Sequence, residues 1–344
     1  MKVLVAGAGG FIGHHLVKRL MSEGFWVRGV DLKRPEFEES PADEFCVADL
    51  RESSAAAAAV SGVEHVYQLA ADMGGIGYIT RHWATIARNN SLINLNMLEA
   101  ARLKGVGRLL FSSSACVYNL QLQGGSEVHS LREEDAYPAF PEPGYGWEKL
   151  YAEQLCRYYR DEFGLDTRIV RFHNCYGPLG TYDGGREKAP SAACRKVALA
   201  QDGDEIEIWG DGEQTRSFMF VDDCIEGLLR LMASGYTEPI NLGSEELVTI
   251  NELFAMTMGI AGKRLRIRHD QTKPQGVRGR NSDNNRIREV LSWCPSISLE
   301  QGLRATYRWI AAQVASATGT SGGHVPEPVS EEPQRAAKPV AARR

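Results

Sequence analysis

Residues 2–13 read KVLVAGAGGFIG, and this stretch decides the fold. Its first part, Lys2–Ala6, is a short apolar run typical of a β-strand. After a glycine-rich turn comes Phe11–Met21, in which apolar residues recur every four positions, the spacing of one helix face. The stretch therefore predicts a strand, a tight turn and an amphipathic helix.

Three glycines of the turn, Gly7, Gly10 and Gly13, have the spacing GxxGxxG. Between a strand and a helix, such glycines let the chain turn sharply and let a pyrophosphate approach the backbone at the helix N-terminus. Glycines also mark ordinary tight turns, but the strand before this turn and the helix after it favour a dinucleotide site. Phe11 and Ile12, at the start of the helix, are the adjoining cofactor-binding candidates.

Asp31 ends the second predicted strand, eighteen residues after Gly13. A carboxylate in this place accepts hydrogen bonds from the adenosine ribose hydroxyls and repels a 2′-phosphate, so the sequence favours NAD over NADP. Lys33 and Arg34 follow closely and weaken that preference, and an ordinary strand-end turn residue is the alternative interpretation of Asp31. Further cofactor-binding candidates follow the third and fourth predicted strands: Asp49, Leu50, Ala70 and Ala71.

More apolar runs of strand length follow, with helical spacing between several of them. The predicted strands are 26–30, 45–47, 65–69, 108–111 and 167–172, and the predicted helices include 86–103 and 145–163. Strands that alternate with helices imply a parallel sheet covered on both faces. The predicted fold class is therefore α/β, a Rossmann-type doubly wound sheet.

The regular alternation breaks past about residue 175, where Gly and Pro cluster with charges in 177–190 and again in 274–285. Within this half, 221–232 and 300–314 have helical spacing, and 205–209 alternates like a strand. We expect a nucleotide-binding domain over 1–175, to which some later segments return, and a smaller mixed α/β lobe over 176–315. Residues 316–344, rich in Ser, Gly, Ala, Pro and Glu, predict a disordered tail.

Composition excludes several classes of protein. The chain has 344 residues, 43% hydrophobic and 24% charged, with a formal charge of −5, which predicts a globular protein without a nucleic-acid footprint. No apolar stretch reaches the length of a membrane span, and glycines interrupt any N-terminal signal sequence. The seven cysteines are scattered without CxxC pairs, so neither disulfides nor a metal site is predicted, and a reducing cytoplasm fits best.

Tyr145 and Lys149 lie four residues apart in a predicted helix, so their side chains share one face. An ammonium there lowers the phenol pKa and lets the tyrosine act as a base, whereas a solvated polar face is the alternative. The partner is the predicted strand end, where Ser112, Ser114 and Cys116 share a face if the chain stays extended. Positive charge near Cys116, which Lys149 and the oxidised nicotinamide could supply, would favour its thiolate.

The glycine turn, the serine run and YxxxK about thirty residues later resemble the extended short-chain dehydrogenase/reductases, a family of nucleotide-sugar enzymes. Six further segments are similar, in order and spacing, to those of the GDP-mannose 3,5-epimerase family within it. They are SSSACVY (112–118), GYGWEKL (144–150), RFHNCYGP (171–178), GGREKAP (184–190), WGDGEQTRSF (209–218) and GVRGRNSDNN (276–285). The resemblance covers roughly residues 1–315.

The resemblance implies an NAD-dependent epimerase that acts on GDP-mannose and related GDP-hexoses at C3 and C5. By this resemblance, Tyr145 takes the O4 proton while NAD takes the C4 hydride, and Ser114 holds the carbonyl that forms. The ketone acidifies the neighbouring carbons C3 and C5, and Cys116 and Lys188 are the acid/base pair that inverts them. A buried cysteine and a solvated lysine are the alternatives. The implied substrate-binding residues, beside Ser114, Cys116 and Lys188, are Asn174, Glu187, Lys196, Gln214, Thr215, Arg216, Arg278 and Arg280.

Two other functions stay open at this point. A GDP-mannose 4,6-dehydratase or a sugar-nucleotide 4-epimerase would keep NAD, Tyr145 and Lys149, and a non-catalytic NAD-binding scaffold would use the same fold. The family pattern usually has proline after the tyrosine that corresponds to Tyr118, but this chain has Asn119 there. That difference puts the shape of the loop 120–129 in doubt. The family resemblance also implies a homodimer through 86–103 and 145–163.

Overall fold

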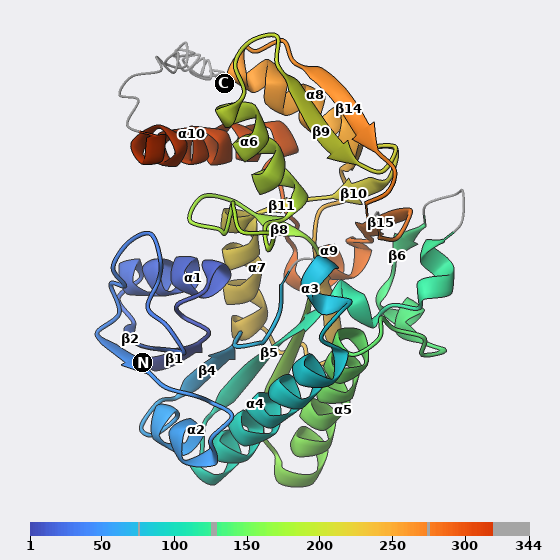
Figure 1. Ribbon diagram of the computed structural model, residues 1–344. Helices are drawn as coiled ribbons and strands as arrows, with labels where there is room; N and C mark the ends of the chain where they lie inside the picture. The colour runs from blue at the N-terminus through green and yellow to red at the C-terminus, as the bar shows by residue number, and fades with distance from the viewer. Residues whose placement is uncertain (75, 125–128, 274–275, 319–344) are drawn as a thin grey trace, which may run out of the picture.

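The computed structural model describes residues 1–74, 76–124, 129–273 and 276–318. Its centre is a seven-stranded sheet in which every neighbouring pair is parallel, in the order β12-β7-β5-β4-β1-β2-β3 (Figure 1). The strands are β1 (Lys2–Ala6), β2 (Trp26–Asp31), β3 (Glu44–Val47), β4 (His65–Gln68), β5 (Arg108–Ser114), β7 (Thr167–Phe172) and β12 (Pro239–Leu242). The order reverses between β1 and β4, which is where open α/β sheets bind ligands.

Helices cover both faces of this sheet because its side chains alternate between two cores. Val3 and Val5 of β1 pack with α1 (Phe11–Ser22) and α7 (Val221–Ala233). Leu4 and Ala6 of the same strand pack on the other face with three helices. These are α2 (Ser53–Ala59), α4 (Trp83–Leu103) and α5 (Tyr145–Phe163). The short helix α3 (Ile76–Ile79) precedes α4. The structure thus confirms the doubly wound α/β fold.

The C-terminal lobe contains three small sheets. One has the order β13 (Leu247–Thr249), β10 (Thr215–Ser217), β15 (Gly279–Ser282) and β6 (Ser130–Leu131). The others pair β14 (Arg266–Asp270) with β9 (Glu205–Trp209) and β11 (Met219–Phe220) with β8 (Cys175–Tyr176). The helices are α6 (Ala189–Leu199), α8 (Ile250–Ala261), α9 (Asn285–Leu291) and α10 (Leu299–Thr318). Among the described residues of the N-terminal half, short 3₁₀ turns are η1 (Ala115–Val117), η2 (Leu120–Gln123) and η3 (Glu133–Ala136).

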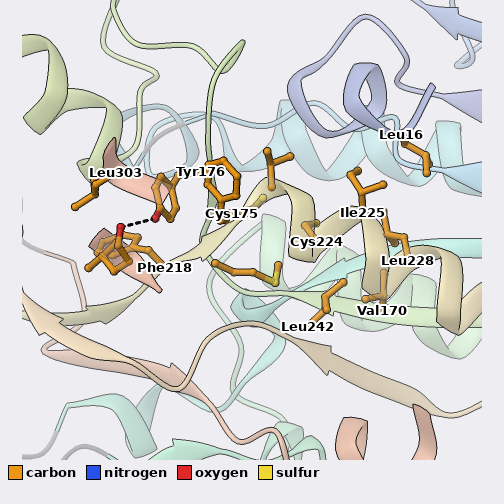
Figure 2. Packing of buried hydrophobic residues seen from close by; sticks show 14 of the residues in the cluster. Leu16, Val170, Cys175, Tyr176, Phe218, Cys224, Ile225, Leu228, Leu242 and Leu303 are labelled. Carbon is orange, nitrogen blue, oxygen red and sulfur yellow. Dashed lines mark hydrogen bonds between the residues drawn. The ribbon is translucent and has the colours of Figure 1, made fainter. Parts of the chain in front are cut away.

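One hydrophobic core joins the sheet to this lobe. Figure 2 shows part of it, from Leu16 of α1 across Ile225 and Leu228 of α7 to Tyr176 and Leu303. The Tyr176 hydroxyl donates a hydrogen bond of 3.0 Å to the Leu299 carbonyl at the start of α10. The continuous core holds the lobe against the carboxyl ends of the strands.

Most predicted elements appear with bounds shifted by one to four residues, but three findings differ from the predictions. β5 continues to Ser114 and then gives way to η1, and β12 joins the main sheet although no strand was predicted there. Of the predicted disordered tail 316–344, residues 316–318 belong to α10 and the rest lies outside the described residues. None of the helices described is long and apolar enough to cross a lipid bilayer.

Candidate active site

The glycine turn is required by close packing between strands and helix. Gly7 has φ +86°, and a Cβ there would lie 2.8 Å from the Ala70 nitrogen at the end of β4. A Cβ on Gly13 would lie 2.0 Å from the Gly7 carbonyl oxygen. Only glycine fits at these two positions, so the turn brings the N-terminus of α1 up to the point where the strand order reverses.

This helix terminus fits a dinucleotide diphosphate. Within the described part of the chain no side chain caps α1, and its first turn carries no acidic residue, so its N–H groups suit an anionic ligand. A cleft of about 370 Å³, open to solvent, lies against Gly10, Phe11 and Lys33. Asp31 borders the same turn, because its Oδ2 accepts a hydrogen bond of 2.9 Å from the Gly9 N–H. Burial raises the pKa of the Asp31 carboxyl.

The other cofactor candidates differ in what their side chains can do. Asp49 forms an ion pair with Arg51, which holds the Asp49 pKa below its usual value. Leu50 is buried in the core on the α2, α4 and α5 face of the sheet. Ala70 and Ala71 follow β4, half-buried, beside the glycine turn. Leu50 can therefore reach a ligand only through its backbone, whereas the two alanines line the turn itself.

Tyr145 and Lys149 begin α5 and are both buried. The Lys149 Nζ donates a hydrogen bond of 2.8 Å to the Ser112 carbonyl and lies 5.7 Å from the centre of the Tyr145 ring. The Ser114 hydroxyl hydrogen-bonds the phenol. Lys149 was predicted to lower the Tyr145 pKa, but in the structure that pKa is raised well above its usual value. Burial is the main cause, followed by the charges of Cys116 and Glu148.

Cys116 reaches the same place by a turn rather than along a strand. Ser114 is the N-cap of η1 and accepts a hydrogen bond of 3.2 Å from the Cys116 N–H. The shared strand face was expected only if the chain stayed extended, and that condition fails for Cys116 because the chain bends after Ser114, whereas Ser112 and Ser114 both lie in β5. Ser112 is buried beneath and donates to the Gln68 carbonyl. A Cβ on Gly146 would lie 2.3 Å from the Cys116 carbonyl oxygen, so η1 packs directly against the first turn of α5.

The cation in contact with the thiol is Arg280 of β15, whereas Lys149, the cation proposed from the sequence, interacts with the thiol only through its charge. The Arg280 Nη1 lies 3.8 Å from the Cys116 Sγ, its Nη2 donates to Glu142 at 2.6 Å, and its Nε donates to Gln123 at 2.6 Å. The pKa of the Cys116 thiol is raised to about 11, mainly by burial and then by the Glu142 carboxylate, while Arg280 opposes both. Arg280 therefore lies at the thiol, held by two other side chains, rather than standing ready as a phosphate clamp.

Lys188 lies in the other lobe, at the N-cap of α6, with an exposed side chain. The neighbouring Glu187 accepts a hydrogen bond of 3.2 Å from Arg195, which also pairs with Asp183 at 3.4 Å. Among the contacts of the residues described, none joins Lys188 to Cys116. The two residues of the predicted acid/base pair thus lie apart, one on η1 and one at the start of α6.

Other predicted substrate residues lie at β10, and Glu187 lies just before α6. Gln214 Oε1, Thr215 Oγ1 and Glu187 Oε2 are buried polar atoms without a partner among the described residues. Arg216 donates to the Val277 carbonyl at 2.5 Å, and burial lowers its pKa to about 10, with Arg280 contributing. Buried polar atoms of this kind usually have a partner, so their presence fits a site that binds a polar ligand.

The remaining predicted residues have protein partners. Asn174 donates to the Ser217 carbonyl at 3.2 Å, and Lys196 donates to the Glu207 carbonyl at 2.6 Å. Arg278 is exposed and forms a salt bridge of 2.9 Å with Asp211. A diphosphate would have to compete with that carboxylate for the Arg278 guanidinium.

Comparison with known proteins decides the family. Residues 3–243 match the family described as "NAD dependent epimerase/dehydratase family". The chain belongs to this family. The "GDP-mannose 3,5-epimerase" of Arabidopsis thaliana is 49% identical over 316 residues, 91% of this chain and 83% of the relative. The "dTDP-4-dehydro-6-deoxy-D-allose reductase" of a Streptomyces species is 35% identical and covers 89% and 95%.

Solved structures of epimerases resemble the whole fold. UDP-glucose 4-epimerase from Thermotoga maritima, with UDP-glucose, matches with a TM-score of 0.83 and 27% identity, over 91% of this chain and 100% of that one. UDP-glucuronic acid 4-epimerase from Bacillus cereus, in complex with UDP-glucuronic acid and NAD, matches with a TM-score of 0.78 and 26% identity over the same shares. NAD is the cofactor of this epimerase/dehydratase, and the uncapped glycine turn is built for it.

Sequence reasoning missed Glu142 and Gln123, the two residues that hold Arg280. Glu142 lies three residues before Tyr145, which is the one local signal that could have pointed to it. Asn119 caps η2 by accepting from the Gln121 N–H at 2.9 Å, and its Nδ2 donates to the Pro138 carbonyl at 3.0 Å. Of the loop whose shape Asn119 put in doubt, residues 125–128 lie outside the described residues.

Proposed function

We propose that this NAD-dependent epimerase converts GDP-mannose at C3 and C5, to GDP-L-galactose and/or GDP-L-gulose, through transient oxidation at C4. The observation that carries the proposal is the position of the Cys116 thiol, on a turn that packs against the first turn of α5 and beside both Ser114 and Tyr145. A thiol beside this hydroxyl pair is an additional proton-transfer group that simple C4 oxidation and reduction does not use. The sequence similarity to the Arabidopsis and rice enzymes named GDP-mannose 3,5-epimerase supports the same substrate.

The first step in the proposal makes two unreactive carbons acidic. NAD, when bound, supplies the acceptor and later the donor of the C4 hydride. Tyr145 removes the proton from O4, and Ser114 hydrogen-bonds the carbonyl oxygen that forms. Lys149 lies one helical turn from Tyr145 and holds the Ser112 carbonyl, so it also fixes the end of β5 on which Ser114 lies. The 4-ketone then acidifies the C–H groups at C3 and C5.

The second step inverts a centre by removing a proton on one side of the ring and returning one on the other. Cys116 is the proposed base and Lys188 the proposed acid. Their positions in different lobes support this assignment, because a sugar bound between the N-terminal domain and the lobe would face both groups. Lys188 is exposed at the start of α6, so it can recover a proton from solvent after each transfer.

The remaining substrate residues are proposed to bind the nucleotide and diphosphate. Arg216, Lys196 and Arg278 supply positive charge, while Asn174 and Glu187 reach the sugar or the diphosphate. The unpartnered Gln214 Oε1 and Thr215 Oγ1 support a polar ligand at β10. Arg280 is proposed to act at the thiol end of this site, where it contacts Cys116.

An NMR time course in deuterated water tests the function, with purified protein, GDP-mannose and no added NAD. We expect deuterium at C3 and C5 and new galactose- or gulose-configured sugars, with NAD retained on the protein. Cys116→Ala should abolish that exchange while C4 oxidation remains measurable as bound NADH. A 4-keto-6-deoxy product would instead identify a dehydratase, inversion confined to C4 would identify a 4-epimerase, and unchanged GDP-mannose would contradict the substrate.

We also propose that the protein is a homodimer through the outer faces of α4 and α5. Trp83 and Leu95 of α4 and Trp147, Tyr151 and Tyr158 of α5 are all about half exposed, an apolar surface of the kind that helix pairs bury. The two helices pack side by side (Figure 1). Sedimentation as a monomer at micromolar concentration would contradict the dimer. The seven free cysteines support the proposal of a reducing, cytoplasmic environment.

A further inference from the structure

Three aromatic rings from separate parts of the chain pack together beside the cleft at the glycine turn. Phe37 follows β2, Tyr182 lies in the segment between β8 and α6, and Trp309 lies in α10. The ring centre of Trp309 is 4.8 Å from that of Phe37 and 5.5 Å from that of Tyr182, and both contacts are edge to face. The ring centres of Phe37 and Tyr182 are 5.9 Å apart. Each ring therefore contacts both of the others, and we call the three the aromatic cluster.

Two of these rings belong to segments that form walls of the cleft. Residues of the segments 33–38 and 177–183 line the cleft together with the glycine turn. Phe37 belongs to the first segment and lines the cleft itself, and Tyr182 belongs to the second. The contact between the two rings thus ties one wall of the cleft to another, and Trp309 ties both walls to α10.

Both segments are also attached to α1. In the first segment, the Glu38 carboxylate accepts a hydrogen bond of 2.6 Å from the Lys18 Nζ, and the His14 Nε2 hydrogen-bonds the same oxygen at 2.8 Å. In the second segment, the Pro178 carbonyl accepts a hydrogen bond of 2.9 Å from the His15 Nε2. The two walls are therefore held by specific side-chain contacts, and the cleft widens only when such contacts break.

The backbone of the second segment is strained where it lines the cleft. Leu179 has φ +62°, in the left-handed region that favours glycine. A residue keeps such a conformation when the surrounding structure imposes it. The contacts of Pro178 and Tyr182, on either side of Leu179 in the chain, supply that restraint. Loss of the ring contacts would let this wall relax away from the cleft.

An enzyme that oxidises a sugar and then reduces the same molecule must keep its reduced cofactor between the two steps. We propose that the aromatic cluster is the clamp that retains the dinucleotide, which is released only after Phe37 separates from Tyr182 and Trp309. The rings act by holding the walls of the cleft, so they are positioning residues. The inference rests on the placement of NAD at the glycine turn, and it does not depend on which sugar is the substrate.

Phe37 is the member of the cluster whose replacement disturbs the fold least. Tyr182 and Trp309 also pack against the main hydrophobic core, whereas Phe37 lies on the loop between β2 and β3. Phe37→Ala removes two of the three ring contacts, and the release of NAD should become about 10- to 100-fold faster. Phe37→Tyr keeps the ring and should release NAD at close to the wild-type rate.

A matched control is Phe163→Ala, which removes a ring that contacts Tyr159 at 5.3 Å at the C-terminal end of α5. β7 starts four residues after this end, so Phe163 lies at the amino ends of the strands, whereas the glycine turn lies at their carboxyl ends. The same substitution there should leave the release of NAD unchanged.

An isotope chase of the purified holoenzyme measures the release without any sugar. Each protein is mixed with an excess of isotopically labelled NAD, and the unlabelled NAD that stays bound after gel filtration is followed over time by mass spectrometry. Release from Phe37→Ala at the wild-type rate, or an equal acceleration in Phe163→Ala, would overturn the clamp. If Phe37→Ala fails to fold, Tyr182→Ala tests the same ring contact, and release at the wild-type rate would again overturn it.

A double variant shows whether the two walls act through one contact. If they do, Phe37→Ala combined with Tyr182→Ala should accelerate release by less than the product of the two single accelerations. Accelerations that multiply in full would contradict the shared contact. Because the chase contains no sugar, its result stands apart from the NMR test with GDP-mannose. Faster release from Phe37→Ala would support the clamp even if GDP-mannose were left unchanged, and wild-type release would refute the clamp even if GDP-mannose were epimerised.

Discussion

Arg171 and Glu153 form an ion pair beneath the catalytic turn, with side chains only 2% and 1% exposed. Arg171 donates to Glu153 from Nε at 2.9 Å and from Nη2 at 2.7 Å, and Glu153 also accepts from the Ser113 hydroxyl. Glu153→Leu would leave the guanidinium buried without its carboxylate. Removing one partner of such a pair typically costs about 3–5 kcal/mol, a large part of a typical stability of about 5–15 kcal/mol.

The pair can be tested by a double-mutant cycle of Glu153→Leu, Arg171→Met and the two together, measured by urea unfolding. Each single variant should lose about 3–5 kcal/mol, because each leaves one buried charge. The double variant should lose less free energy of unfolding than either single variant, because it buries no charge. Arg171→Met also removes the hydrogen bond of 2.6 Å from Nη1 to the Glu133 carbonyl, which adds a smaller loss. If the double variant loses the sum of the two single losses, the electrostatic reasoning is refuted.

Three other predictions concern chemistry, pH and packing. Tyr145→Phe should lower turnover by about 10²–10⁴-fold with circular dichroism unchanged, and near-normal turnover would contradict its role as a base. Burial lowers the His173 pKa to about 3, so below about pH 6.5 the folded protein binds fewer protons than the unfolded chain. The free energy of unfolding therefore falls as the pH falls, by up to about 1.4 kcal/mol per pH unit. His173→Gln should remove that part of the slope between about pH 6.5 and 5 in urea unfolding, and an unchanged slope would contradict it. Gly302→Ala should lower the free energy of unfolding by about 1–3 kcal/mol, because a Cβ at this position of α10 would lie 2.2 Å from the Tyr176 hydroxyl. The control Gly259→Ala, in α8 with open space around it, should be neutral or stabilising.

The parallel sheet could be predicted because each strand carries its own signal. A strand buried on both faces, such as β1, is recognised as an apolar run, and the helix 145–163 is recognised from its spacing alone. β12 has four residues and begins at Pro239, so its place beside β7 depends on a partner 70 residues earlier in the sequence, Ile169. Pairing at that separation leaves no periodic signal in the sequence.

The site residues likewise divide into those that a local sequence pattern predicts and those that it does not. Gly7, Gly13, Tyr145 and Lys149 depend on short spacings within one turn or one helix, and the structure places each of them in the element expected. The shared face expected for Cys116 depended on an extended chain, and that condition is not met, because Ser114 caps a 3₁₀ turn through a side-chain hydrogen bond that competes with the strand. Local rules thus describe the groups within one element and fail where a side chain changes the backbone.

The charge at the thiol could not be read from the sequence at all. Cys116, Gln123, Glu142 and Arg280 come from η1, η2, the segment before α5 and β15, and Arg280 lies 164 residues from the thiol that it contacts. Lys149 was the cation expected from the sequence; it does interact with the thiol through its charge, but its ammonium donates its hydrogen bond to the Ser112 carbonyl. Since an unpaired buried guanidinium is costly, Arg280 needs Glu142 in the resting protein. The same carboxylate adds to burial in raising the pKa of the Cys116 thiol, so the residue that pairs with Arg280 also disfavours the thiolate beside it.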